Sequence, residues 1–392
     1  MSRGRNPSAT SSGGRGLRWL LVALVALVGC AFPPATALPT VEEALEPVET
    51  VAAADAPTST PQPTAVPTTT PEPTATPVPL PQVCLRQRFA EDAAACDTAP
   101  QYDVTLAVDL DASQVTGSQV ITYTNAESTA LSELYLRLLP NTRGYGGAIS
   151  VTQLRVDGRP ISPTVALEGA ALQLALLPPL PPGAIATVAL DFTVDVPTTG
   201  GTGHALFSYL GGVMALPTIF PIVGVYDENG WDIESVPEHG DEIHADVAIY
   251  DVEITAPETQ TLIASGACTT PQAGLWQCEA APMRDFTVIL GDNYRRAAQE
   301  VDGVVVNSYY YSRHEWGGNQ ALQVAVDAMT AFTELFGPYP YTELDVVETP
   351  NYLGGMEYSG LVVVEDGLYT GNGVEWLTAH EVAHQWWMVV VG

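Results

Sequence analysis

The sequence Asn372-Gly-Val-Glu-Trp-Leu-Thr-Ala-His-Glu-Val-Ala-His384 decides the fold predicted for the C-terminal part of this chain. Its first four residues form a helix-capping signal, so we predict a helix from about Gly373 to the C-terminus. His380 and His384 are four residues apart and share one face of such a helix, where both imidazoles can bind one tetrahedral Zn²⁺. Glu381 points to where a water on that metal would lie and can take its proton. The alternative is a pair of surface histidines on an amphipathic helix.

Further secondary-structure elements are predicted upstream of this helix. Residues 319–336 carry apolar side chains at helical spacing and are followed by Gly337-Pro338, which predicts a helix that ends at Phe336. A strand is predicted over Leu344–Glu348, followed by a glycine-rich turn. Leu361–Val364 is predicted to be an edge strand.

The stretch from Tyr102 to about Tyr294 has a strand-like pattern. Apolar and polar residues alternate in segments such as Tyr102-Asp-Val-Thr-Leu-Ala-Val-Asp-Leu110, with Gly, Pro and Asn between the segments. This pattern predicts an antiparallel, sandwich-like β domain, and nothing in it requires catalytic chemistry.

Three short segments near the histidines carry a resemblance to a known family: Phe336-Gly-Pro-Tyr-Pro-Tyr341, Gly354-Gly-Met-Glu-Tyr358 and Gln385-Trp386. In this order, together with the two histidines, they resemble the membrane alanyl aminopeptidase family of gluzincins, which includes leukotriene-hydrolase-like members. The resemblance implies an α+β multidomain fold. A saddle-shaped N-terminal β domain (residues 100–297) would precede the start of a thermolysin-like zincin catalytic domain (residues 298–392).

The resemblance also implies roles for individual residues. His380 and His384 become zinc ligands, and Glu381 becomes the general base that acts on zinc-bound water. Glu357 would bind the free amino terminus of a peptide substrate, since an internal peptide would leave this carboxylate unpaired.

The rest of the implied substrate-binding turn consists of Gly354, Gly355 and Met356. The two glycines would let the backbone approach the ligand closely. Tyr358 stands where the family usually has Asn, which changes the hydrogen bond next to Glu357.

The function implied is that of a zinc-dependent metallo-aminopeptidase that removes N-terminal residues from extracellular peptides. The family's third zinc ligand and its transition-state tyrosine come later in the chain than Gly392, so we expect this sequence to be the N-terminal part of a longer enzyme and inactive alone. The alternatives are a related gluzincin endopeptidase or epoxide hydrolase, or a catalytically dead cell-surface binding module. The intact His380, Glu381 and His384 argue against the last alternative.

Composition and the N-terminus predict where the protein acts. The chain has 14 basic residues, all of them arginine, against 45 acidic residues, and its net charge of −31 disfavours nucleic-acid binding. Residues 1–30 resemble a lipoprotein-type signal peptide, in which Cys30 is the lipid attachment site. Residues 31–99 are predicted to be a Pro- and Thr-rich disordered linker. We therefore expect an exported lipoprotein, attached through its lipid anchor to the outer face of a bacterial membrane or the cell surface.

The other cysteines fit an oxidising compartment. Cys84 and Cys96 form one candidate disulfide, and Cys268 and Cys278, which flank a predicted hairpin turn, form another. Buried free thiols are the alternative for both pairs.

Two further histidine clusters do not have the spacing of a metal site. His314-Glu315 begins a pattern like that of the last helix but lacks the second histidine, so a surface loop is predicted. His239 and His244, with two acids between them, suit neither one helix face nor one strand face and are predicted to lie in a solvated loop.

Overall fold

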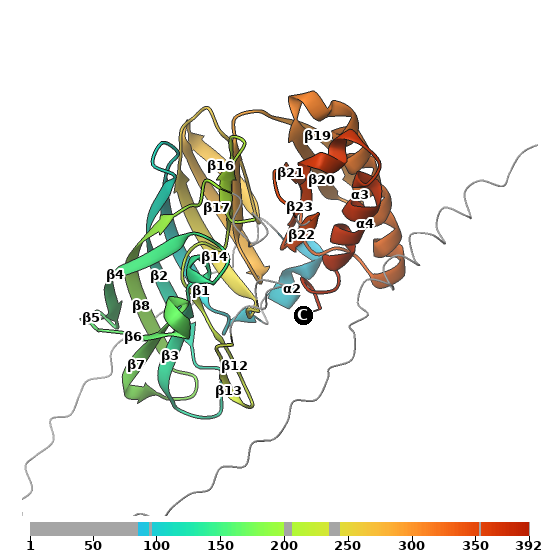
Figure 1. Cartoon of the computed structure of the whole chain (residues 1–392). Helices are drawn as coiled ribbons and strands as arrows, with labels where there is room; N and C mark the ends of the chain where they lie inside the picture. Colours follow the sequence, from blue (N-terminus) through green and yellow to red (C-terminus); the bar gives the residue numbers. More distant parts are fainter. Residues whose placement is uncertain (1–84, 94–95, 200–205, 235–243, 353, 392) are drawn as a thin grey trace, which may run out of the picture.

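The computed structural model of this protein describes residues 85–93, 96–199, 206–234, 244–352 and 354–391. The described chain is mostly β-sheet with few helices, and a large β domain lies beside a smaller C-terminal unit (Figure 1). The predicted signal peptide with Cys30 lies outside the described residues. Within the described ranges, no helix combines the length and the apolar character needed to cross a membrane.

The segment just before the β domain is folded onto the C-terminal unit. It contains η1 (Gln87–Phe89) and α2 (Ala90–Ala93), and Leu85 forms a bridge with Tyr341. The prediction of a disordered linker up to residue 99 is therefore wrong from Leu85 onward. The proline-rich composition ends before this residue, so the chain there can bury apolar area.

An eight-stranded sheet forms one wall of the β domain. In sheet order its strands are β16 (Ala267–Gln272), β17 (Leu275–Met283), β14 (Ala248–Thr255), β1 (Gln101–Asp109), β2 (Gln114–Thr124), β8 (Ile185–Asp195), β4 (Ala148–Val156) and β5 (Arg159–Pro160). Neighbouring strands run antiparallel, except that β1 and β14 run parallel. The prediction of a wholly antiparallel domain is wrong for β1 and β14. A long stretch of chain separates these two strands, so no hairpin forces them to run antiparallel.

Two four-stranded sheets and a hairpin complete the β domain. One sheet contains β15 (Thr261–Ala264), β18 (Thr287–Gly291), β10 (Val213–Pro217) and β9 (Ser208–Leu210); the other contains β11 (Ile222–Val223), β3 (Leu131–Arg137), β7 (Ala171–Leu180) and β6 (Thr164–Ala166). The hairpin pairs β12 (Val225–Asp227) with β13 (Gly230–Asp232), and the single-turn helices are η3 (Leu139–Asn141) and η4 (Leu167–Gly169). Tyr102 and Tyr250 stack in the core with ring centroids 5.1 Å apart.

The C-terminal unit is a five-stranded sheet with helices on one face. In sheet order its strands are β19 (Tyr294–Val301), β20 (Val304–Tyr311), β21 (Glu343–Thr349), β23 (Leu361–Glu365) and β22 (Gly355–Tyr358); the helices are η5 (Ser312–His314), α3 (Glu315–Phe336), η6 (Asp366–Thr370) and α4 (Val374–His384). The two central pairs are parallel and the two outer pairs antiparallel. The domain boundary predicted at residue 298 falls inside β19.

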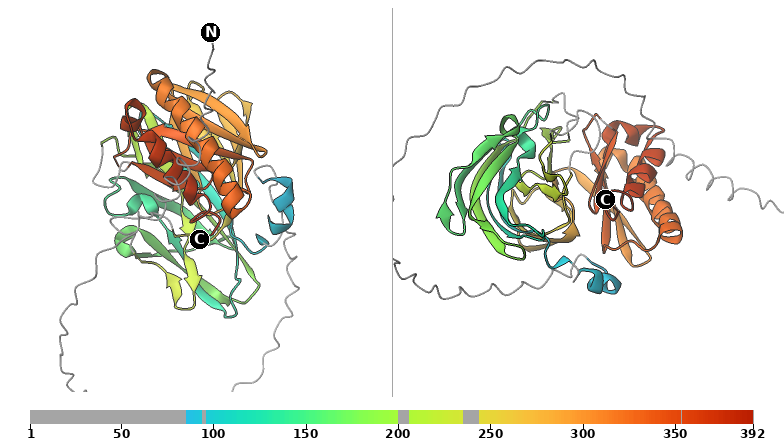
Figure 2. Two further views of the ribbon diagram at one scale, coloured as in Figure 1. Left: turned by 90° about the vertical axis from the view of Figure 1, so that its right-hand side faces the viewer. Right: turned by 90° about the horizontal axis from the view of Figure 1, so that it is seen from below.

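The three interior strands of the C-terminal sheet, β20, β21 and β23, are largely buried on both faces. Helices α3 and α4 cover the face that points away from the β domain (Figure 2). The opposite face packs on the β domain, where Met356 and Val363 join Val213 and Ile289 in one buried cluster. Glu357 alternates with Met356 along β22, so its side chain leaves the sheet on the face that carries α4.

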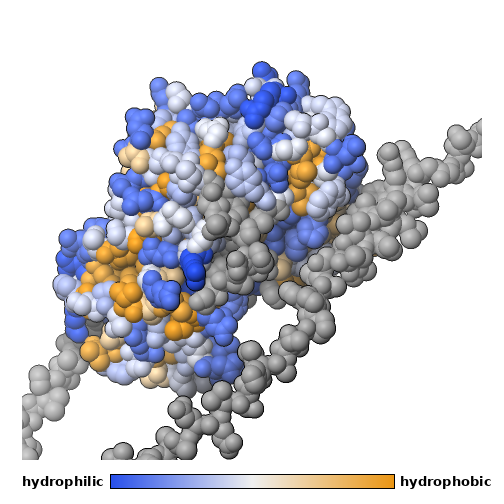
Figure 3. Space-filling model, viewed as in Figure 1, coloured by the Kyte–Doolittle hydropathy of each residue, from blue (hydrophilic) through white to orange (hydrophobic). Residues whose placement is uncertain are grey.

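The surface seen in Figure 3 is largely hydrophilic, in keeping with the excess of acidic residues. Apolar side chains gather over the lower part of the β domain, in the area of β6 and β7 (Figure 3). Val165 of β6 is 66% exposed and Leu177 of β7 is 80% exposed.

Two helix boundaries and the position of one strand in the C-terminal unit differ from the prediction. Helix α3 starts at Glu315, four residues earlier than predicted, because Gly317 and Gly318 fit closely against Tyr369 and Tyr310, where a Cβ would overlap. The predicted helix left Gly317 and Gly318 outside. In the structure these two glycines lie inside the helix and let it pack closely against the two tyrosines.

Strand β23 is not an edge strand, because it pairs with β21 on one side and with β22 on the other. Its four consecutive apolar residues are all buried, which is the pattern of an interior strand. Helix α4 ends at His384 rather than at the C-terminus. The chain then turns back on itself, and the backbone N–H of Val391 donates to the carbonyl of Trp386 at 3.0 Å.

Candidate functional site

His380 and His384 face each other from successive turns of α4. Their Nε2 atoms are 3.2 Å apart, and both residues are half-buried. With Zn–N bonds of about 2.0–2.1 Å, two ligands of a tetrahedral zinc lie about 3.3 Å apart. The imidazole pair therefore fits one zinc ion. Burial, and then the neighbouring His384, lower the pKa of His380, which favours the neutral imidazole that binds a metal.

Glu381 lies between the two histidines in the sequence of α4, in a tightly enclosed position. The residue is only 3% exposed. Its carboxylate lies against β22, where a Cβ built on Gly355 would overlap it. Glycine at position 355 is thus what gives the Glu381 side chain its space.

Glu357 approaches the histidines from β22. Its Oε1 lies 3.7 Å from Nδ1 of His384, and its side chain is 9% exposed. One ligand atom each of Glu357, Glu381 and His384 lies within 4.8 Å of the other two. The structure therefore brings two carboxylates and two imidazoles together from segments that are more than twenty residues apart in the sequence.

The two other predicted substrate-binding residues lie next to this group in different environments. Gly354 has a φ of +94°, a conformation that favours glycine, at the start of β22. The side chain of Met356 is buried in the cluster that joins the sheet to the β domain. Met356 can therefore offer only its backbone to a ligand beside Glu357.

Two polar residues, whose contacts were not predicted from the sequence, are connected to this group. Gln385, next to His384, is fully buried and binds the turn after β22. Asp285, from the β domain, binds the same turn. Gln385 could have been found as a polar residue inside an apolar run, whereas no local pattern singles out Asp285.

The prediction of a surface loop at His314 is wrong. The residue lies at the start of α3, and its side chain is only 12% exposed. Its Nδ1 lies 2.5 Å from Oε1 of Glu348, a fully buried residue of β21. A sequence signal for this contact exists in β21, where the acidic Glu348 follows a run of apolar residues and therefore needs a buried partner. His244 is exposed, and its Nδ1 lies 2.7 Å from Oδ2 of Asp232. His239 lies outside the described residues.

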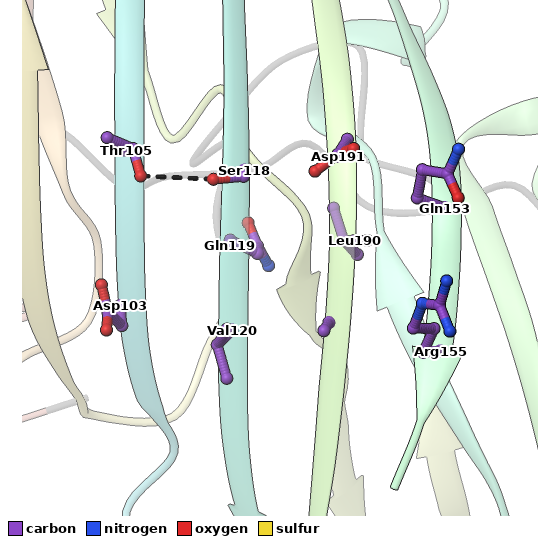
Figure 4. A pocket seen from close by; sticks show the side chains of 10 residues that line it. Asp103, Thr105, Ser118, Gln119, Val120, Gln153, Arg155, Leu190 and Asp191 are labelled. Carbon is purple, nitrogen blue, oxygen red and sulfur yellow. Dashed lines mark hydrogen bonds between the residues drawn. The ribbon is translucent and has the colours of Figure 1, made fainter. Parts of the chain in front are cut away.

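A separate hollow of about 540 Å³ lies on the outer face of the eight-stranded sheet (Figure 4). Asp103, Asp191 and Arg155 point into it, and Thr105 and Ser118 share a hydrogen bond across its floor at 3.2 Å. No histidine or cysteine lines this hollow, so the group of residues on α4 and β22 remains the candidate site among the described residues.

Comparison with known proteins supports the fold. No family model matches the sequence, and no curated protein matches it. Among solved structures, a mutant of the M1 zinc metallopeptidase from Deinococcus radiodurans is 19% identical with a TM-score of 0.51, and the match covers 75% of this chain and 66% of that one. A two-domain M1 zinc metallopeptidase mutant bound to L-tryptophan is 20% identical with a TM-score of 0.52, over 74% of this chain and 65% of that one. At this identity the likeness shows a shared fold, and this chain spans slightly less than two thirds of its neighbours' length.

Proposed function

We propose that this protein is a zinc-dependent metallo-aminopeptidase that removes residues from the amino terminus of extracellular peptides. The observation that carries the proposal is the 3.2 Å spacing of the His380 and His384 Nε2 atoms, together with the buried carboxylate of Glu381. A fold shared with M1 zinc metallopeptidases supports it. On this proposal the C-terminal unit is the start of a thermolysin-like catalytic domain, and the β domain corresponds to the saddle-shaped domain.

His380 and His384 are the residues that would hold the zinc ion. Bound there, zinc would supply a Lewis acid that polarises the scissile carbonyl. Glu381 accepts a proton from the attacking water and delivers it to the leaving amine. Because Glu381 is shielded from bulk solvent, its position relative to the substrate is fixed before the reaction, and acid–base work of this kind contributes roughly 10²- to 10⁴-fold.

Glu357 accounts for the preference for a free amino terminus. Its carboxylate lies beside the histidines and is largely removed from water, so a substrate ammonium would find a charge-assisted partner there. A peptide without that ammonium would bring no positive charge to this carboxylate and would lose the charge-assisted hydrogen bond. Neighbouring structures hold L-tryptophan and L-arginine, free amino acids that carry such an ammonium.

Zinc binding and peptide turnover together test the proposal. In a protein that also carries the third zinc ligand implied by the resemblance, equilibrium dialysis should give about one equivalent of zinc, and His384→Ala should lose it. Glu381→Gln should keep the zinc and lose turnover of an aminoacyl p-nitroanilide by roughly 10²- to 10⁴-fold. The exposed His244 offers a matched control, since His244→Ala should change neither property. Zinc that His384→Ala retains would overturn the proposed site, and faster turnover of N-acetylated than of free peptides would favour an endopeptidase.

We also propose that the protein is exported and anchored through lipid on Cys30. The support is the signal-like sequence that precedes this cysteine. Expressed in a bacterium, the wild-type protein should partition into the detergent phase of a Triton X-114 separation, and Cys30→Ser should move to the aqueous phase or fail to mature. Wild-type protein in the aqueous phase would exclude the anchor.

A further inference from the structure

The turn that joins β22 to β23 begins two residues after Glu357. It consists of Ser359 and Gly360, and Gly360 has a φ of +74°. Ser359 is fully buried, although it lies in a turn. Turns usually lie at the surface, because their backbone polar groups need partners. Here side chains from outside the turn accept its two N–H groups, and the backbone N–H of Asp345 donates to the carbonyl of Gly360 at 3.0 Å.

Asp285 of the β domain binds the turn from one side. Both of its carboxylate oxygens accept the backbone N–H of Ser359 at 3.1 Å, and Oδ2 also accepts the Ser359 hydroxyl at 2.8 Å. The carboxylate is buried, with the residue 6% exposed. Such charge-assisted hydrogen bonds to a shielded carboxylate are among the stronger ones in proteins.

Gln385 binds the same turn from the side of α4. Its Oε1 accepts the backbone N–H of Gly360 at 3.0 Å and the hydroxyl of Tyr339 at 3.0 Å. Its Nε2 donates to the carbonyl of Tyr358 at 2.9 Å. Gln385 follows His384 directly, so these bonds connect the end of the histidine-bearing helix to the residue after Glu357.

Arg284 extends the connection to the segment after α4. Its backbone N–H donates to the Ser359 hydroxyl at 3.3 Å, and its Nε donates to the carbonyl of Val389 at 3.2 Å. The pair Arg284-Asp285 therefore contacts both the turn beside Glu357 and the chain that follows His384. Strand β22, which carries Glu357, lies at the edge of the sheet and pairs with β23, so the turn is one of the points that hold this strand beside α4.

We propose that Asp285 and Gln385 are positioning residues that fix the Glu357 carboxylate beside His384, so that the β domain takes part in recognising the substrate's free amino terminus. The inference rests on the proposed aminopeptidase function. Neither residue touches the substrate: both act through Glu357. Without Asp285 the turn loses its only charged partner among the described residues, and β22 is then free to shift along α4.

The first test measures substrate preference on the protein that also carries the implied third zinc ligand. Asp285→Ala should lower kcat/KM for a peptide with a free amino terminus by about tenfold to a hundredfold more than for its N-acetylated form. Asp285→Asn should restore part of this loss, since its amide oxygen can still accept the Ser359 N–H. The matched control is Asn125→Ala, which removes a fully buried side chain that holds a turn in the β domain by donating to the carbonyls of Thr129 and Leu180. It should leave the preference unchanged.

A double-mutant cycle separates positioning from general stability. If Asp285 acts through Glu357, then Asp285→Ala should have little further effect on the preference in a Glu357→Ala background. Equal losses on both substrates, or full additivity in the cycle, would overturn the inference. If a wild-type protein that includes the implied third zinc ligand cleaves no peptide, the proposed function is overturned instead.

Amide hydrogen exchange tests the attachment itself without reference to activity. The amides of Ser359 and Gly360 donate to side chains, so Asp285→Ala should accelerate exchange at Ser359, and Gln385→Leu should accelerate it at Gly360. Unchanged exchange in both variants would show that the turn does not depend on these residues and would overturn the inference.

Discussion

Gly355 and Glu381 lie so close together that a Cβ on Gly355 would overlap the Glu381 carboxylate. The first residue begins β22, and the second lies between the two histidines of α4. The strand and the helix can approach this closely only because residue 355 has no side chain. The glycine thus determines where the buried carboxylate stands relative to the imidazole pair.

Replacing this glycine should displace Glu381. We expect Gly355→Ala to lower the free energy of unfolding by about 1–3 kcal/mol through overpacking, and to lower peptide turnover by about a hundredfold while zinc binding persists. Urea unfolding, zinc dialysis and an aminoacyl p-nitroanilide assay measure the three effects. Gly371→Ala is the control, because a Cβ there would meet nothing within 4 Å. A Gly355→Ala protein with wild-type stability would show that the contact relaxes at no cost.

Stability should depend on pH through Glu348. Burial raises the pKa of this carboxyl to about 7, although the backbone N–H of Tyr311 and the side chain of His314 act to lower it. Because the folded-state pKa lies above the ordinary value of 4.5, the folded protein binds this proton more tightly than the unfolded chain. The stabilisation is complete below about pH 4.5 and is lost as the pH rises through 7. At roughly 1.4 kcal/mol per pKa unit, the effect amounts to about 3 kcal/mol.

Urea unfolding at pH 5 and pH 8 measures this dependence. The wild-type protein should be less stable at pH 8, and Glu348→Gln should reduce the difference. Some dependence should remain, because burial also raises the pKa of Asp285 to about 6. Glu300→Gln, an exposed change on β19, controls for the loss of one negative charge. An unchanged difference in Glu348→Gln would mean that Glu348 does not titrate in this range.

Local patterns account for the parts of the fold and site that the sequence could predict. The four-residue spacing of His380 and His384 determines their common face on any helix, and the alternation along β1 determines which of its side chains are buried. The error at β23 came from reading a continuous apolar run as an edge, although such a run is typical of a strand covered on both faces.

Contacts between distant segments could not be predicted in this way. Asp285 and Ser359 are 74 residues apart, and neither stands in a motif. The end of α4 at His384 was missed for a similar reason. Residues after it are apolar enough to continue a helix, but the partners that draw Trp386 under the helix come from α3 and the segment after it.

The disulfide between Cys268 and Cys278 should stabilise the edge of the eight-stranded sheet. The two residues lie directly opposite each other on β16 and β17, with a sequence separation of 10. Closing a loop of this length in the unfolded chain is worth about 2–3 kcal/mol in the chain-entropy model. Cys268→Ala/Cys278→Ala should lower the free energy of unfolding by this amount, measured in urea without reductant.

The neighbouring cross-strand pair of Thr269 and Gln277 provides the matched control. Both residues are exposed, and they are opposite each other in the same register. Thr269→Ala/Gln277→Ala should cost less than about 1 kcal/mol. Equal losses in the two double variants would mean that the disulfide adds nothing to the pairing of β16 with β17. The other candidate pair stays a prediction, since Cys84 lies outside the described residues.

Trp386 and Trp387 are adjacent but should differ in their contribution to stability. Trp386 is 6% exposed, packs against the rings of Phe332 and Tyr339, and donates its Nε1–H to the carbonyl of Gly337 at 2.9 Å. Trp387 is 42% exposed, with Phe336 as its nearest ring at 4.3 Å. We expect Trp386→Ala to lower the free energy of unfolding by about 3–5 kcal/mol, because it leaves a cavity under the end of α4. Trp387→Ala should cost about 1 kcal/mol, the worth of a partly exposed aromatic pair. Urea unfolding of the two variants measures these losses, and Trp386→Phe separates ring packing from the lost hydrogen bond. If the segment after His384 were uniformly exposed, both alanine variants would lose equally little free energy of unfolding.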